Sequence, residues 1–148
     1  GISCPLFPGT ADKKFHFVLR FHEITAGPPL KVGGNSASAV PVSHPSGAPS
    51  YALRLEAAGR VIAFSGDTEW VEPLLEVAAG ADLYISECYG YDTPTPYHMC
   101  WKGIERRLPE LTARRIMLTH MSTRMLQHAT HIDDDRIIVS HDGLVIEL

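Results

Sequence analysis

Two histidines and one aspartate carry the strongest chemical signal in this sequence. His44, Asp67 and His120 each follow an apolar run typical of a β-strand, and each stands where a turn is expected. Imidazole nitrogens and carboxylate oxygens are ligands that zinc accepts together. Because the ends of neighbouring strands can meet at one edge of a sheet, we expect these three side chains to form a metal site.

Each of these residues has a simpler explanation when it is taken alone. Asp67 or Thr68 can cap the helix that the following residues predict. His44 and His120 can be strand-end histidines whose ring nitrogens bond to the backbone. Residue type and position nevertheless agree across three separate elements, and this agreement favours a shared site over three independent structural roles.

The elements that must position these residues alternate between strands and helices. Apolar alternation and turn signals predict strands over residues 15–24, 37–43, 50–56, 60–65, 82–86 and 115–119. Helices are predicted from an N-cap at Thr68 to a stop at Gly80, over 101–111 and over 122–128. The last residues predict a hairpin of 136–139 and 144–147 around a turn at Asp142-Gly143. This alternation favours an α/β layered fold.

Composition narrows the class of protein. The 148 residues suit one domain. The net charge of −4 gives no sign of the positive surface that nucleic-acid binding needs. No apolar stretch approaches the roughly 20 residues that span a membrane, so no membrane partner is expected. The three cysteines, Cys4, Cys88 and Cys100, show no C-x-x-C spacing. Free thiols and the lack of a signal-peptide pattern predict a cytoplasmic location.

At this point the motifs resemble a known family. Ser65-Gly66-Asp67-Thr68 and the later run 118–122, Leu-Thr-His-Met-Ser, follow His44 in an order similar to that of metallo-β-lactamase-fold hydrolases. The similarity is greatest to the branch of ribonuclease Z and related phosphodiesterases. It implies the C-terminal half of an αββα sandwich, with a mixed β-sheet and helices on one face. It also implies a hydrolase that attacks a phosphodiester or ester-like substrate with metal-activated water.

The resemblance assigns a role to five residues. It implies that His44, Asp67 and His120 bind two zinc ions, with Asp67 bridging them, while manganese or iron stays open as the metal. It further implies that Glu87 orients His98, which protonates the leaving oxygen. For these two residues an ion-pair partner and a surface histidine remain the alternatives.

One expected motif is missing from the sequence. The family signature H-x-H-x-D-H, which supplies the other metal ligands, does not occur in residues 1–148. We therefore predict that the chain is a single partial domain, the C-terminal half of a longer protein, and that it is inactive alone. Only 22 residues, 45–66, separate His44 from Asp67. They leave no room for the tRNA-gripping arm of ribonuclease Z, so a small-molecule substrate is expected instead.

A second hypothesis comes from the same missing motif. The chain can be a non-catalytic binding or self-associating module that never assembles a complete metal site. Half of a sandwich exposes an apolar sheet face, and such a face favours association. The partner would be a second copy, giving a homo-oligomer, or the missing N-terminal half.

Overall fold

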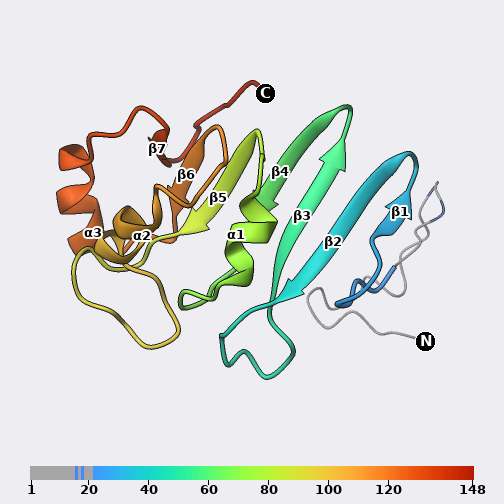
Figure 1. Ribbon diagram of the computed structural model, residues 1–148, viewed down its shortest axis with the longest axis horizontal. Coiled ribbons are helices and arrows are strands. Elements are labelled where there is room, and N and C mark those ends of the chain that lie inside the picture. The colour runs from blue at the N-terminus through green and yellow to red at the C-terminus, as the bar shows by residue number, and fades with distance from the viewer. Residues whose placement is uncertain (1–15, 17, 19–21) are drawn as a thin grey trace.

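One seven-stranded mixed sheet organises the protein (Figure 1). The computed structural model describes residues 16, 18 and 22–148. The strands lie side by side in chain order: β1 (Leu30–Val32), β2 (Asn35–Pro41), β3 (Tyr51–Ala57), β4 (Arg60–Phe64), β5 (Leu83–Glu87), β6 (Ile116–Thr119) and β7 (Ile137–Val139). Neighbours from β1 to β4 are antiparallel, and neighbours from β4 to β7 are parallel.

Tight turns build the antiparallel half as the sequence predicts. Ala58 and Gly59 both have positive φ, 51° and 74°, and they close the β3–β4 hairpin. Gly33 and Gly34 close a second hairpin between β1 and β2, of which the short strand β1 was not predicted. The strand predicted over 15–24 falls largely on residues outside the described part of the chain.

Three α-helices connect the parallel strands: α1 (Pro73–Ala78), α2 (Trp101–Arg107) and α3 (Thr123–His128), the last continued by a short 3-10 helix, η1 (Ala129–His131). Figure 1 shows α1 lying across the sheet in front of its middle strands. Helix α1 begins at Pro73, so Thr68 is not its N-cap as predicted. Helix α2 ends at Arg107, before Pro109, and is thus shorter than predicted. No helix in the described part of the chain is long and apolar enough to cross a membrane.

The predicted C-terminal hairpin is wrong. Strand β7 pairs with β6 in parallel, and residues 144–147 form no strand. The predicted turn does form, since the Leu144 N–H donates to the His141 carbonyl at 3.1 Å and Gly143 has φ of 80°. After this turn the chain leaves the sheet, and the Glu147 carbonyl accepts a hydrogen bond from the Arg115 guanidinium at 2.7 Å.

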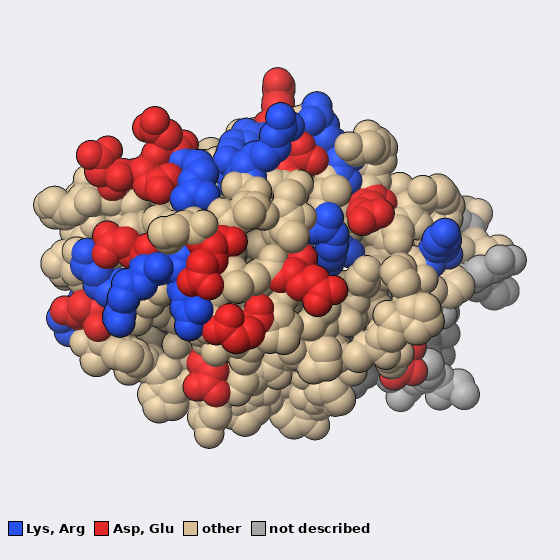
Figure 2. Space-filling view, viewed as in Figure 1, with Lys and Arg blue, Asp and Glu red and all other residues tan. Residues whose placement is uncertain are grey.

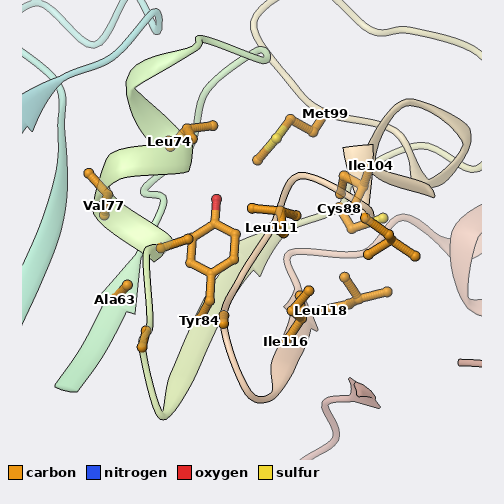
Figure 3. Close-up of a cluster of buried hydrophobic side chains, with 14 of the residues drawn as sticks. Ala63, Leu74, Val77, Tyr84, Cys88, Met99, Ile104, Leu111, Ile116 and Leu118 are labelled. Carbon is orange, nitrogen blue, oxygen red and sulfur yellow. The ribbon is translucent and has the colours of Figure 1, made fainter. Parts of the chain in front are cut away.

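The hydrophobic core lies between the helices and one face of the sheet (Figure 3). Tyr84 and Leu118 from the strands meet Leu74 and Ile104 from the helices, and all four side chains are almost fully buried. The Tyr84 hydroxyl has no hydrogen-bond partner among the described residues. Burial raises the pKa of this phenol, which therefore stays protonated. The mixed sheet with helices on one face agrees with the predicted fold class.

The opposite face of the sheet is also apolar. Leu53 pairs with Phe64, and Leu55 pairs with Ile62, so four apolar side chains point away from the helices. Leu55 is 41% exposed and Phe64 is 37% exposed. Strands that are apolar on both faces are typical of a sheet covered by further layers on both sides.

Asp82 joins the beginnings of two strands. Its carboxylate accepts the Val61 N–H at 2.9 Å and lies 3.3 Å from Arg60 and 3.2 Å from Arg114. The Val61 hydrogen bond, followed by the two guanidinium groups, holds the pKa of the Asp82 carboxyl below its ordinary value. A carboxyl with a lowered folded-state pKa stabilises the fold above its unfolded pKa of about 3.9. This contribution is lost as the pH falls through the folded-state value.

We expect Asp82→Asn to lower the thermal midpoint at pH 7 by a few degrees, because the amide cannot replace the two ion pairs. The difference between wild type and variant should shrink as the pH is lowered from 5 toward 2, which circular dichroism melts at several pH values would measure. Asp142→Asn, in the exposed terminal turn, is the matched control. An equal difference at every pH would contradict this assignment.

Candidate metal and acid–base site

The candidate residues gather at one edge of the sheet. Strands β2, β4, β5 and β6 point the same way, and their carboxyl ends lie at the lower edge in Figure 1. His44 follows β2, Asp67 follows β4 and His120 follows β6, while Glu87 is the last residue of β5. The edge beyond the carboxyl ends of such strands is where α/β folds place their ligands.

Gly66 determines the path of the loop that carries Asp67. It has φ of 63°, and a Cβ added there would lie 2.8 Å from the Tyr51 carbonyl oxygen. Glycine is therefore required by both conformation and space. On the other side of Gly66, the Ser65 hydroxyl accepts the Glu87 N–H at 2.9 Å, which ties the ends of β4 and β5 together.

Hydrogen bonds also join the His44 loop to the Asp67 loop. The Ser43 N–H donates to the Thr68 hydroxyl at 3.0 Å, and the Glu69 N–H donates to the Ser43 carbonyl at 3.3 Å. The Ser43 hydroxyl donates to Glu69 Oε1 at 2.5 Å. Thr68 thus contributes to the site by connecting two loops, and α1 begins only further along the chain, at Pro73.

Asp67 and His120 form a pair that fits the chemistry of a metal. His120 Nε2 lies 3.8 Å from Asp67 Oδ2. This separation is too long for a hydrogen bond, but it is within twice the roughly 2.0–2.2 Å bond that zinc makes to nitrogen or oxygen. His120 adopts φ of 55°, a left-handed conformation that non-glycine residues rarely take and that is often found at functional sites.

The third predicted ligand, His44, contacts His98, which lies between it and His120 in this chain of rings. The His44 ring is 5.2 Å from the His98 ring between centroids, and the His98 ring is 5.3 Å from that of His120. Within residues 16, 18 and 22–148, no group of three His, Cys, Asp or Glu side chains is close enough to hold a metal ion. The donor types fit zinc, but the described residues supply too few donors at one point for a closed site.

The structure brings Glu87 and His98 into direct contact. Both carboxylate oxygens of Glu87 lie near His98 Nδ1, at 3.2 and 3.1 Å. Glu87 is fully buried and also accepts the Thr68 N–H. Burial raises the pKa of the Glu87 carboxyl, although the Thr68 N–H and His98 act in the opposite direction. The His98 side chain is only 18% exposed, so it is not a free surface histidine.

Tyr89 is a member of the site that the sequence analysis missed. Its ring stacks on His98 with 5.0 Å between centroids and lies 5.8 Å from His120. Its carbonyl accepts the Ser122 N–H at 3.0 Å, which anchors the chain beyond His120. The available signal was its position, two residues beyond Glu87 at the end of β5.

Comparison with known proteins identifies the family. The model of the β-lactamase superfamily domain matches residues 6–121, and the chain belongs to this family. A ribonuclease Z of Mycobacterium bovis is 27% identical over 106 residues, which are 72% of this chain and 34% of that protein. The chain therefore spans about a third of the length of the curated relatives that it matches.

Solved structures agree with this fold. The metallo-β-lactamase fold protein YhfI from Bacillus subtilis superposes with a TM-score of 0.66 and 22% identity over 78% of this chain and 51% of YhfI. A diphosphatase from the PhnP family gives a TM-score of 0.68 with 21% identity, over 82% of this chain and 46% of that protein. Both similarities establish the metallo-β-lactamase fold that the motifs predicted.

Proposed function

We propose that this chain is part of a metal-dependent hydrolase that cleaves a small phosphodiester or ester-like substrate. The observation that carries this proposal is the meeting of two pairs at one sheet edge. One pair, Asp67 and His120, has the chemistry and spacing of metal ligands, and the other, Glu87 and His98, has those of an acid–base pair. Names of similar proteins, ribonuclease Z and diphosphatase, support cleavage at phosphorus.

In this proposal His44, Asp67 and His120 hold zinc. A bound zinc ion supplies positive charge and lowers the pKa of water, so that hydroxide is available near neutral pH. The family resemblance implies two ions, for which further donors are needed. We propose that these donors come from a part of the protein outside the described residues, because the chain spans only about a third of its curated relatives.

The chain's own acid–base pair, Glu87 and His98, would protonate the leaving group. When Glu87 is ionised, its two oxygens accept the Nδ1–H of His98, which fixes the ring and its tautomer. The other ring nitrogen, Nε2, can then carry the proton that a departing alkoxide needs. The stacked Tyr89 ring restricts rotation of the imidazole.

We further propose a small substrate in place of tRNA. The β3–β4 hairpin occupies the interval between His44 and Asp67, where an arm would have to be inserted. Figure 2 shows acidic and basic side chains interspersed on the helix-covered face, and its lower margin consists mainly of uncharged side chains with a few acidic ones. Such a margin gives little attraction to a polyanion.

A second candidate, a self-associating module without catalysis, is favoured by the apolar sheet face opposite the helices. Exposed Leu55 and Phe64 belong to this face, and contiguous exposed apolar surface often marks an interface. The occupant would be a second copy of the chain or another part of the same protein.

One set of measurements separates the two candidates. We expect the full-length protein to retain about two zinc ions per chain after desalting and to hydrolyse bis(4-nitrophenyl) phosphate. Elemental analysis, a colorimetric assay and light scattering on the same sample would show this. A metal-free protein that forms stable oligomers and hydrolyses nothing would favour the self-associating module and reject the hydrolase.

The two cysteines in the described part, Cys88 and Cys100, are free and buried. Burial raises the pKa of the Cys88 thiol to about 12, so this thiol is unreactive at neutral pH. On the basis of these unpaired thiols we propose that the protein works in the cytoplasm.

A further inference from the structure

A pocket opens directly beside His98. It has a volume of about 470 Å³ and lies between the loop after Asp67, the loop before α2, and α2 itself. His98 lines this pocket while its Nδ1 faces Glu87. His98 therefore belongs both to the wall of this pocket and to the acid–base pair.

The walls of the pocket are mainly apolar. Met99 and Ile104 line it and are themselves 3% and 1% exposed, because they belong to the hydrophobic core shown in Figure 3. Trp70 forms part of another wall, and Pro94 and Pro96 form part of the loop side. Rings and fixed loops of this kind favour a flat apolar group.

The charge of the pocket disfavours anions. Glu69 lines it as a carboxylate, and no Lys or Arg occurs among the described residues that line it. Arg107 lies over the Trp70 ring, with Cζ 5.2 Å from its centroid, but it forms ion pairs with Glu72 at 3.1 Å and Glu110 at 3.3 Å. An anionic ligand would meet the Glu69 charge without a free cation to offset it.

We propose that this pocket binds the leaving-group alcohol of the substrate, and that this alcohol is apolar or aromatic and carries no negative charge. The inference rests on the proposed hydrolase function. In the reaction a water oxygen bonds to phosphorus, and the bond from phosphorus to the leaving oxygen breaks with its electron pair on that oxygen. His98 supplies the proton to this oxygen, and the proton lost by water restores His98, so phosphodiester and water give an alcohol and a phosphomonoester.

Gly103 offers a way to fill the pocket without disturbing the fold. It lies inside α2 and lines the pocket, and a Cβ there would make an ordinary contact of 3.5 Å with Cys100 Sγ. Leucine is also a far better helix former than glycine. Gly103→Leu should therefore fold normally and occupy the space for the ligand. Arg106→Leu, at an exposed position of the same helix, is the matched control.

Binding can be measured on the full-length protein by NMR, with the Trp70 indole N–H as reporter. Benzyl alcohol and 4-(hydroxymethyl)benzoate are suitable probes, because they differ by one carboxylate. We expect benzyl alcohol to bind about tenfold more tightly or better than the benzoate. We expect Gly103→Leu to weaken its binding by about tenfold or more and Arg106→Leu to leave it unchanged. Equal binding of both probes, or undiminished binding to Gly103→Leu, would overturn the proposal.

Hydrolysis provides an independent readout. Methyl phenyl phosphate should be cleaved with a higher kcat/KM than its 4-carboxyphenyl analogue, and Gly103→Leu should abolish this preference. If neither compound is cleaved but benzyl alcohol still binds near Trp70, the hydrolase function and the leaving-group role are both contradicted. The binding result would then still show that the pocket is an apolar site. Cleavage of both at equal rates would contradict the pocket's selectivity alone.

Discussion

Asp67→Asn in the full-length protein is expected to lower kcat/KM for bis(4-nitrophenyl) phosphate by about 10³-fold or more. The amide keeps the size of the side chain but removes the negative charge and one of the two equivalent oxygens. Asp67 lies 3.8 Å from His120 Nε2, so the same change should reduce the zinc retained after desalting. Steady-state kinetics and elemental analysis of one preparation would measure both effects.

Stability should hardly change in this variant. The Asp67 side chain is 42% exposed, and substitutions at exposed positions usually alter the free energy of unfolding by less than about 0.5 kcal/mol. A normal melting temperature would therefore show that activity was lost through the site. Asp142→Asn, in an exposed turn, should have wild-type activity and zinc. Full activity and full zinc in Asp67→Asn would contradict its role as a ligand.

His98→Ala is expected to lower kcat/KM by about 10²- to 10⁴-fold for a substrate with an alkoxide leaving group. The loss arises because the variant lacks the imidazole that would supply the proton to the leaving oxygen. A 4-nitrophenyl ester should be affected far less, since nitrophenolate departs without protonation. Comparing the two leaving groups separates a proton donor from a residue that only maintains structure.

Glu87→Gln tests the partner of this histidine. The amide can still accept the Thr68 N–H, so the fold should persist, but the negative charge facing His98 Nδ1 is lost. We expect the same dependence on the leaving group as in His98→Ala, with a smaller loss of rate. His141→Ala, at an exposed turn, is the control. A uniform loss of rate for both leaving groups would contradict the acid–base assignment.

The sequence by itself determined most of the elements and the edge at which they meet. Strand alternation located β2 to β6, and the Ala58-Gly59 pair located the hairpin, because these signals depend on local conformation and on the two-residue period of a strand. The convergence of Asp67 and His120 followed from the same logic, since parallel neighbouring strands end at the same edge. The family motifs placed Glu87 and His98 as partners.

Only the tertiary structure decided which local signals would be used. Thr68 is a good N-cap by type, yet its hydroxyl accepts the Ser43 N–H and its own N–H donates to Glu87. Both of these partners are far from Thr68 in the sequence. The Asp142-Gly143 turn formed without a returning strand. The stacking of Tyr89 on His98 and the pocket beside them also required the fold. Contacts between residues far apart in sequence leave no periodic signal, so packing alone selects among the partners that each side chain could accept.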